Sequence, residues 1–400
     1  MKELQSKQLD YIVQLFGEGD EAPDMNWVSQ LEVNPKTGHA ATTVENIRII
    51  VKNDPRFKGT FYWDEFMERP MVCGDLPWRK ADAKPRSWDD TDDAGVHNVL
   101  EKDYKIDSMP KTREGVDLAL ADITRHPVRE YLRSLIWDGE KRCETLFIDY
   151  LGAEDSRYTR TVTRKALIGA AARILSPGCK HDHMLVLIGP QGCRKSTTLK
   201  KLGKEWFSDS LYTMSGKDAY EQLQGFWIIE LSEMAATRKA EVEQIKQFVS
   251  KQEDNYRAAY ARRTQCHPRQ CAFFGTTNDE EFLRDPTGAR RFWPVVVTDS
   301  GKTLGDKLTA SIVDQIWAEA VTYYEAGETW YLDGAVEEMA RKVQADHTEA
   351  NGKLGLIENF LEVLLPEGWD DWDLEKRLMF WSGGFGEERN GTVPLSLIHI

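Results

Sequence analysis

The sequence predicts an α/β protein with a mostly parallel sheet, and two features of the chain support this. Between residues 161 and 297, four short apolar runs of strand character alternate with segments of helical periodicity. A glycine-bearing loop follows the first of these runs directly and leads into a helical segment. This alternation of strands and helices favours parallel pairing of the strands in one sheet.

The predicted strands are short and rich in apolar, aromatic or β-branched residues: MLVLI at 184–188, FWIIE at 226–230, CAFFGTT at 271–277 and FWPVVV at 292–297. A helix is predicted at 161–175, where it ends before Pro177-Gly178. A second is predicted at 238–250, where Val242, Ile245, Phe248 and Val249 mark one helical face.

A chain of 400 residues exceeds the usual single-domain length of roughly 100 to 200. We expect a mainly helical N-terminal domain at 1–150, whose polar run at 80–95 forms an exposed loop and whose last helix ends at Asp138-Gly139. The domain of the parallel sheet follows at 151–345. A C-terminal helical segment at 346–400 ends in PLSLIHI without a closing element, so we expect it to be truncated.

The composition is that of a globular protein, with 41% hydrophobic and 30% charged residues. No apolar stretch approaches the ~20 residues that span a bilayer, and the N-terminus lacks an apolar signal-peptide core, so we expect a cytoplasmic protein. The six cysteines are scattered and show no zinc-site spacing. We therefore expect reduced thiols.

The net charge of −14 argues against a protein whose whole surface coats nucleic acid. Any contact with DNA must be local. The segment 255–271 is the best candidate, because it carries Arg257, Arg262, Arg263 and Arg269 and no acidic residue.

The loop after the first strand has the composition of a phosphate-binding loop. It reads GPQGCRKST and comprises Gly189, Pro190, Gln191, Gly192, Cys193, Arg194, Lys195, Ser196 and Thr197. In such loops backbone N–H groups face the phosphates, a lysine reaches the β and γ groups, and a hydroxyl holds Mg²⁺. Lys195 and Ser196 are the residues for these roles. The alternative is a strand-to-helix turn with a chance lysine.

Arg194 departs from the usual pattern GxxxxGK[ST], which has glycine before the lysine. Glycine serves there by adopting positive φ, and a side chain at a strained angle costs of order 1–3 kcal/mol. The guanidinium of Arg194 would offset part of this strain by binding a phosphate.

Polar residues follow the next two predicted strands. Glu230 and Glu233 are candidates for holding the Mg²⁺ water shell and polarising the attacking water, the alternative being a solvated rim. Asn278, after Thr276 and Thr277, is a candidate sensor of the γ-phosphate, the alternative being a turn.

Arg290 and Arg291 follow a turn before the last strand, and an arginine supplied in trans stabilises the charge on a transferring phosphate. His181 and His183 form an HxH pair without a third ligand nearby, so we expect a solvated turn rather than a metal site. The first 150 residues show no catalytic carboxylate cluster of a primase, and we assign no primase activity.

At this point a resemblance becomes specific. It rests on NIRIIVKNDPRFKG, WDGEKR, SPGCKHDHMLVLIGPQGCRKST, EWFSDS, GFWIIELSEM, KAEVEQIKQFVSKQEDNYRAAYAR and PRQCAFFGTTNDEEFLRDPTGARRFWPV, which together span most of residues 45–300. The chain resembles the virulence-associated protein E family of phages and genomic islands. That family is similar to superfamily 3 helicases and belongs to the wider AAA+ ATPases.

The resemblance implies a Walker A motif at Gly189–Ser196, a Walker B-like pair at Glu230 and Glu233, sensor Asn278, and arginine fingers at Arg290 and Arg291. It also implies an oligomeric ring, often a hexamer, with the nucleotide between subunits. Helicases of this kind place a DNA-contacting hairpin between Walker B and the sensor. The DNA-contact candidates there are Lys251, Arg257, Arg262 and Arg263, and the alternative is a solvated basic face.

We therefore expect an ATP-dependent DNA helicase or translocase of phage or mobile-element replication, with ATP and Mg²⁺ as cofactors. Single-stranded or forked DNA and a separate primase are its expected partners, in the cytoplasm of a bacterial host. A rival is a nucleotide-controlled DNA-binding or origin-assembly module that hydrolyses ATP weakly or not at all because of Arg194. A third interpretation is a small-molecule kinase, which the resemblance does not favour.

Overall fold

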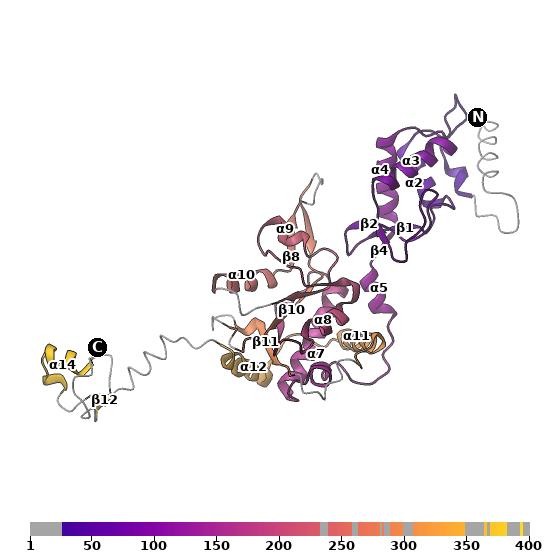
Figure 1. Ribbon diagram of the computed structural model, residues 1–400. Helices are drawn as coiled ribbons and strands as arrows, with labels where there is room; N and C mark the ends of the chain where they lie inside the picture. Colours follow the sequence, from indigo (N-terminus) through magenta and orange to yellow (C-terminus); the bar gives the residue numbers. More distant parts are fainter. Residues whose placement is uncertain are drawn as a thin grey trace.

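The computed structural model describes residues 26–232, 239–257, 263–280, 282–283, 289–298, 307–348, 364–365, 369–381 and 393–394. Within them, the chain forms an N-terminal unit and a larger unit that carries a five-stranded sheet (Figure 1).

The N-terminal unit packs three helices and a 3-10 turn on a small sheet of short strands. The helical elements are η1 (Asn26–Gln30), α2 (Val44–Asn53), α3 (Asp90–Tyr104) and α4 (Met109–Asp122), and the strands are β1 (Phe61–Asp64), β2 (Arg69–Val72), β3 (Arg86–Ser87) and β4 (Thr124–Arg125). The order in the sheet is β3-β2-β1-β4, and only β1 and β4 pair in parallel. This sheet differs from the mainly helical domain that the sequence predicts.

The N-terminal core is made of apolar side chains from all three helices and from β1. Ile47 and Ile50 of α2, Val96 and Leu100 of α3 and Phe61 of β1 are fully or almost fully buried in one cluster. Gly115 of α4 lies against Ile47, where an added Cβ would come within 2.4 Å of that side chain. The absence of a side chain at this position lets α2 and α4 approach closely.

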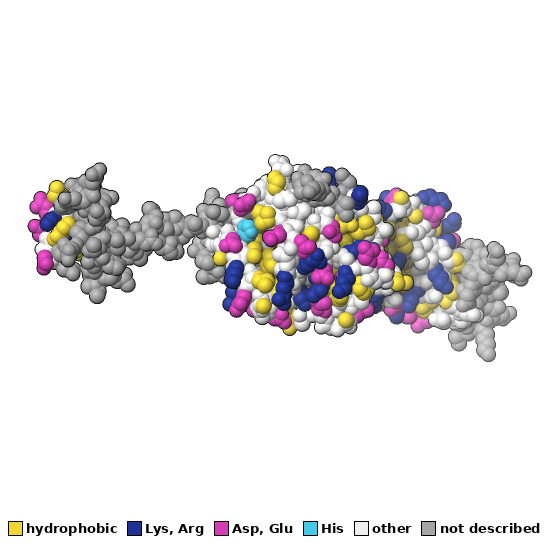
Figure 2. Space-filling view, turned by 90° about the horizontal axis from the view of Figure 1, so that it is seen from below, with side chains coloured by type: hydrophobic (Ala, Val, Ile, Leu, Met, Phe, Trp, Pro, Cys, Tyr) yellow, Lys and Arg dark blue, Asp and Glu magenta, His cyan; other side chains and the backbone are white. Residues whose placement is uncertain are grey.

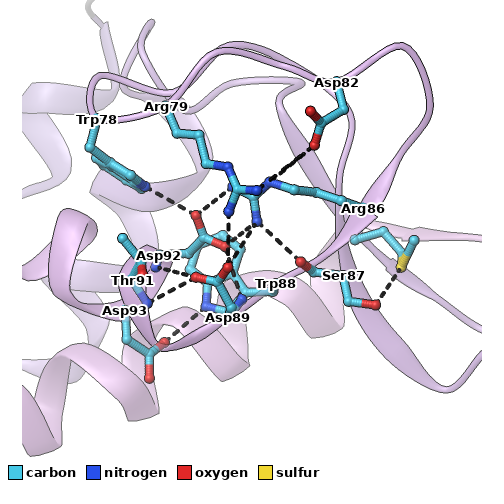
Figure 3. A network of polar contacts seen from close by, with 11 residues as sticks. Trp78, Arg79, Asp82, Arg86, Ser87, Trp88, Asp89, Thr91, Asp92 and Asp93 are labelled. Atoms are coloured by element: carbon cyan, nitrogen blue, oxygen red, sulfur yellow. Dashed lines mark hydrogen bonds and ion pairs between the residues drawn. The ribbon is translucent and has the colours of Figure 1, made fainter.

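The polar run at 80–95 is an exposed loop only in its first part. Residues 80–85 are exposed, but Arg86 enters β3 and the acidic residues from Asp90 onward begin α3. Asp92 is completely buried and accepts hydrogen bonds from Arg86 at 2.6 and 2.7 Å and from the indole of Trp78 at 3.0 Å (Figure 3). Asp89 caps α3 by accepting from the backbone of Thr91. This network holds the loop against the helix, so the expectation of a wholly exposed loop is wrong.

The larger unit is built on a parallel sheet in the order β11-β5-β10-β7-β6. Its strands are β5 (Met184–Ile188), β6 (Phe207–Ser208), β7 (Ile228–Leu231), β10 (Ala272–Thr277) and β11 (Phe292–Val296). The α/β fold with a mostly parallel sheet is confirmed. Four of these strands match the predicted runs to within two residues at each end, because strands covered on both faces are continuously apolar.

Helices cover both faces of the sheet. They are α5 (Pro127–Ser134), α6 (Leu146–Leu151), α7 (Arg157–Leu175), α8 (Lys195–Gly203), α9 (Gly216–Glu221), α10 (Lys239–Val249), α11 (Ala310–Glu325) and α12 (Gly334–Asp346), with 3-10 turns η2 (Lys204–Trp206) and η4 (Ala289–Arg291). Leu185 and Leu187 of β5 face the cluster that includes α7, α8 and α11. Met184, Val186 and Ile188 face the cluster that includes α9 and α10. The alternation follows from the two-residue period of a strand.

Two predicted helices have different bounds in the structure. α7 begins four residues before the predicted start, because the hydroxyl of Ser156 caps it by accepting from the backbone of Thr159 at 3.1 Å. α5 ends at Ser134 rather than at Asp138-Gly139, since Leu135 takes an extended conformation.

A separate two-stranded ribbon joins α10 to β10. Its strands β8 (Glu253–Tyr256) and β9 (Gln265–Pro268) pair only with each other among the described strands, in antiparallel register. The remaining described elements are β12 (Leu364–Leu365), η6 (Trp369–Asp371), α14 (Leu374–Trp381) and β13 (Val393–Pro394). None of the described helices has the length and apolar character needed to span a bilayer.

Candidate nucleotide site

The candidate site lies where the carboxyl ends of the central strands meet. The loop from Gly189 to Arg194 leaves the end of β5 and enters α8. Beside it, β10 ends at Thr277 and β7 at Leu231. Open parallel sheets bind ligands at this edge. A hollow of about 430 Å³ opens here, lined by Gln191, Gly192, Cys193, Arg194, Lys195, Ser196, Thr197, Ser232, Thr276, Thr277 and Asn278.

Close backbone packing and positive φ angles fix the shape of the loop. A Cβ on Gly189 would lie 2.3 Å from the carbonyl oxygen of Val297, so only glycine fits there. Gly192 has φ 90°. Arg194 has φ 66° and ψ 21°, the left-handed conformation, and sits directly before the first residue of α8. This is the positive φ that glycine usually adopts before the lysine of such a loop, and it costs roughly 1–2 kcal/mol for a residue with a Cβ.

Lys195 is buried at the start of α8 and is surrounded by oxygen atoms. Its ammonium donates to the carbonyl oxygens of Gly189 at 2.5 Å and Pro190 at 3.0 Å. It also donates to Oδ1 of Asn278 at 3.0 Å. The structure therefore brings together the lysine of the loop and the candidate sensor of the next strand, which are 83 residues apart in the sequence.

Glu230 of β7 joins the loop to β10. Its side chain is 2% exposed, and Oε1 accepts from Ser196 Oγ and from Thr276 Oγ1, both at 2.6 Å. Its other oxygen, Oε2, is buried and has no hydrogen-bond partner among the residues that the structure describes. From the sequence, Thr276 is only one of three polar residues at a strand end. Phe274 is in register with Glu230, and Thr276 lies two residues further along β10. This spacing is the signal that connects Thr276 with Glu230.

The oxygen atoms at Glu230 fit a magnesium ion. Mg²⁺ is usually held by one or two carboxylates, water and the phosphates of the substrate rather than by a cage of protein ligands. The hydroxyl of Ser196 is a group of this kind. Oε2 of Glu230 has no donor among the described residues, which is costly for a buried carboxylate oxygen unless a cation or its water satisfies it. No cluster of three His, Cys, Asp or Glu residues suited to a metal occurs in the described part of the chain.

Glu233, the second predicted acidic residue, lies outside the described residues. The structure therefore places one carboxylate, that of Glu230, at the loop.

The two candidate finger arginines lie at the opposite end of the sheet. They belong to η4, directly before β11, and the first residue of β11 is in register with Met184, the first residue of β5. The five residues of β5 separate this end from the loop by roughly 16 Å, at about 3.3 Å per residue. Arg290 is exposed, whereas Arg291 is half-buried and donates from Nε to Ser250 Oγ at 2.8 Å. Neither lines the hollow of its own chain.

The basic segment overlaps the two strands of the β8–β9 ribbon. Arg257 directly follows β8 and Arg263 lies two residues before β9, and both are exposed; Arg262 lies outside the described residues. Lys251 is half-buried and donates to the hydroxyl of Tyr220 at 2.6 Å. Arg269 does not belong to an exposed patch, because it is 3% exposed and pairs with Asp254 at 2.6 Å.

Charges are mixed on one face of the molecule. On the face that Figure 2 shows, basic and acidic side chains are interspersed and no continuous basic area forms among the described residues. This agrees with the net charge of −14.

The HxH pair is not a solvated turn. His181 is 5% exposed, and burial holds the pKa of its imidazole well below the usual value. His183 stacks on Trp293 with ring centres 4.5 Å apart. The expected solvated turn is wrong for this reason, since both rings pack against the protein interior.

The chain has been compared with known proteins. The model of the virulence-associated protein E-like domain matches residues 132–349. An A-form apo structure of the C-terminal region of NrS-1 is 11% identical, with a TM-score of 0.46, over 85% of this chain and 82% of that chain. A second apo structure of that region is 13% identical, with a TM-score of 0.38, over 81% and 77%. No curated protein gives a significant match.

Proposed function

This chain belongs to the virulence-associated protein E-like family, and from that premise we propose that it is an ATP-dependent DNA helicase or translocase of phage or mobile-element replication. The observation that carries the proposal is the contact of Glu230 with Ser196 at 2.6 Å, beside the buried Lys195. A carboxylate, a hydroxyl and an ammonium at the end of parallel strands are the groups that phosphoryl transfer from a nucleotide requires.

The sheet and loop support an AAA+-like P-loop core as part of this proposal. The glycine-bearing loop runs from β5 into the amino end of α8, where backbone N–H groups and the helix dipole favour an anionic ligand. The strand that follows β5 along the sheet, β10, brings Asn278 to the loop, and the next, β7, brings Glu230.

The side chains have separate roles in the proposed reaction. When the nucleotide binds, Lys195 breaks its hydrogen bonds to the loop carbonyls and binds the β and γ phosphates. Asn278 senses the γ-phosphate through its hydrogen bond with Lys195. Ser196 would hold Mg²⁺ directly and Glu230 would hold it through a water of its hydration shell, and the bound ion would neutralise charge on the phosphates.

Hydrolysis follows from this arrangement. Water attacks the γ-phosphorus, the bond to the bridging oxygen of the β-phosphate breaks, and ADP leaves with the electron pair. Glu230 orients the water and accepts its proton at Oε2 before passing it to solvent. The products are ADP, inorganic phosphate and one proton.

A ring of subunits is part of the same proposal. Because Arg290 and Arg291 lie at the far end of the sheet from the loop of their own chain, they serve a site only when a neighbour presents its loop to them. The ring, often a hexamer in related helicases, would pass single-stranded or forked DNA along the basic ribbon tips and act with a separate primase. This work takes place in the cytoplasm of a bacterial host.

A second candidate is a nucleotide-controlled DNA-binding module with little or no turnover. The observation that favours it is the left-handed conformation of Arg194, which puts a large side chain where such loops have glycine. The two candidates differ in ATP turnover and not in ATP binding.

The deciding experiment measures ATP hydrolysis with and without single-stranded DNA, on the wild type and on Lys195→Ala. The helicase proposal expects hydrolysis that DNA stimulates and that Lys195→Ala abolishes. Tight binding of ATP without turnover by the wild type would instead establish the DNA-binding module. Phosphate transfer to a small acceptor, independent of DNA, would overturn both.

A further inference from the structure

The turn between β1 and β2 of the N-terminal unit packs against the larger unit (Figure 1). Phe66, in this turn, is 5% exposed and belongs to the main core cluster of the larger unit. Asp64 closes the turn by accepting from the backbone of Phe66 at 2.8 Å and of Met67 at 2.9 Å. Met67 packs on Gly225, where a Cβ would come within 3.0 Å of its side chain. The turn is therefore anchored in the larger unit.

Glu68, the last residue of this turn, contacts two segments of the larger unit. Its Oε1 accepts from Nδ1 of His267, on β9, at 2.7 Å, and its Oε2 accepts from Nε2 of Gln224 at 2.9 Å. The backbone of Glu68 has φ 53°, a conformation that residues with a Cβ rarely adopt. The turn holds this strained conformation at the residue whose carboxylate makes both contacts.

The two contacts reach both strands of the β8–β9 ribbon. Gln224 also donates to the hydroxyl of Tyr256, the last residue of β8. The ring of Tyr256 stacks on that of His267, with centres 4.2 Å apart. Burial, and then the nearby carboxylate of Glu68, raise the pKa of Tyr256, so its hydroxyl stays protonated. Glu68 thus supports both strands of the ribbon, and Tyr256 directly precedes the exposed Arg257.

The ribbon depends on such support because an isolated two-stranded ribbon is marginally stable. Within the ribbon region, Arg269 pairs with the buried Asp254 of β8. A second group of contacts fixes the ribbon to the rest of the protein and is made by Glu68, Gln224, Tyr256 and His267. Gln224 also precedes β7 by four residues, and β7 carries Glu230. The same carboxylate therefore contacts the ribbon and the segment that leads to the catalytic strand.

We propose that Glu68 is a positioning residue through which the N-terminal unit sets the angle of the β8–β9 ribbon for binding nucleic acid. The proposal rests on the DNA-dependent ATPase function proposed above. Glu68 touches neither nucleotide nor nucleic acid and acts through His267 and Gln224. Its loss weakens DNA stimulation and leaves the nucleotide site intact.

The test uses the full chain as wild type, Glu68→Ala, Glu68→Gln and the control Glu65→Ala. Glu65 lies in the same turn but contacts Arg129 of α5, at 3.4 Å, and not the ribbon. For Glu68→Ala, which removes both contacts, we expect unchanged hydrolysis without DNA and an increase of about tenfold in the oligonucleotide concentration for half-maximal stimulation, the equivalent of about 1.4 kcal/mol in binding. Glu68→Gln keeps an oxygen acceptor and should recover part of this loss, while Glu65→Ala behaves as wild type.

Hydrogen exchange of the amides from Glu253 to Gln265 provides a readout that does not depend on hydrolysis. Faster exchange in Glu68→Ala, but not in Glu65→Ala, is expected even if the wild type proves inactive, in which case only the proposed function fails. Unchanged exchange in Glu68→Ala overturns the inference. So does an active protein whose half-maximal oligonucleotide concentration is the same in Glu68→Ala and wild type.

Discussion

Ser196 donates a hydrogen bond of 2.6 Å to Glu230, although 34 residues separate them in the sequence. The contact connects the amino end of α8 to the end of β7, across the intervening β10, and Thr276 of β10 donates to the same carboxylate oxygen. One oxygen of Glu230 is therefore fixed by two hydroxyls, while Oε2 has no partner among the described residues. A carboxylate held at one oxygen and free at the other is suited to orienting a water molecule or a cation.

The first prediction concerns this carboxylate. Glu230→Gln keeps the shape and the two hydroxyl contacts but removes the charge and the proton acceptor. We expect kcat for ATP hydrolysis to fall by about 100-fold or more, the range for a lost general base, with little change in the affinity for ATP. Steady-state hydrolysis and equilibrium titration with ATP measure the two effects.

The control for this change is Glu101→Gln, on the exposed side of α3 in the N-terminal unit. It should leave both quantities unchanged. Hydrolysis at the wild-type rate by Glu230→Gln would show that this carboxylate has no part in the chemistry.

The second prediction tests whether arginines act between subunits. Arg290→Ala should reduce hydrolysis by about 10³-fold or more, the range for an arginine finger. A mixture of Arg290→Ala with Lys195→Ala chains should be more active than either alone, because some pairs of neighbours combine an intact loop with an intact arginine. Mixing experiments over a range of ratios measure this.

Arg341→Ala serves as the matched control, since Arg341 is exposed on α12 and pairs with Glu337 at 2.8 Å. It should hydrolyse ATP as the wild type does. If mixtures of Arg290→Ala and Lys195→Ala show only the sum of their separate activities, Arg290 does not complete a neighbour's site.

The third prediction concerns the stability of the N-terminal unit. Asp92 has a completely buried side chain; its burial raises the pKa, but the hydrogen bonds from Arg86, the backbone of Asp89 and Trp78 outweigh this, so the pKa is lowered overall. A carboxyl with a lowered pKa contributes stability that is present above its unfolded pKa of about 3.9 and is lost as the pH falls below that value.

Asp92→Asn should therefore lower the free energy of unfolding by about 3 kcal/mol at neutral pH, as expected when one partner of a buried ion pair is removed. The difference from wild type should shrink as the pH decreases toward 3. Denaturant unfolding followed through tryptophan fluorescence measures it. Asp82→Asn is the control, because Asp82 is mostly exposed and lies 3.9 Å from its nearest arginine nitrogen. Equal stability of both variants at pH 7 would contradict the role given to Asp92.

The sequence was sufficient to predict the central strands and the groups at their ends. A continuous apolar run such as MLVLI identifies a strand covered on both faces, and parallel strands bring the residues that follow them to one edge. Lys195, Glu230 and Asn278 are in contact with the loop for this reason. Their roles in catalysis remain predictions until the variants above are measured.

The N-terminal sheet was not predicted because its strands are too short to show a period. They have two to four residues, and β2 contains a proline, so no alternation of apolar and polar residues identifies them as strands. The pairing of Arg269 with Asp254 could not be predicted from the sequence either. It depends on the register of β8 and β9, and a basic residue among other basic residues indicates an exposed position by default.

The last prediction addresses Arg194, the residue that departs from the usual loop pattern. Because the backbone of Arg194 already has φ 66°, the loop has the shape that glycine normally provides. Arg194→Gly should therefore change kcat by less than about fivefold, the equivalent of roughly 1 kcal/mol in the barrier. Arg194→Ala keeps the strained backbone and removes the guanidinium, so a loss of ATP affinity in both variants identifies a contact with phosphate. A rise in kcat of tenfold or more in Arg194→Gly alone would mean that the strained conformation restrains hydrolysis, and would favour the nucleotide-controlled binding module for the natural chain.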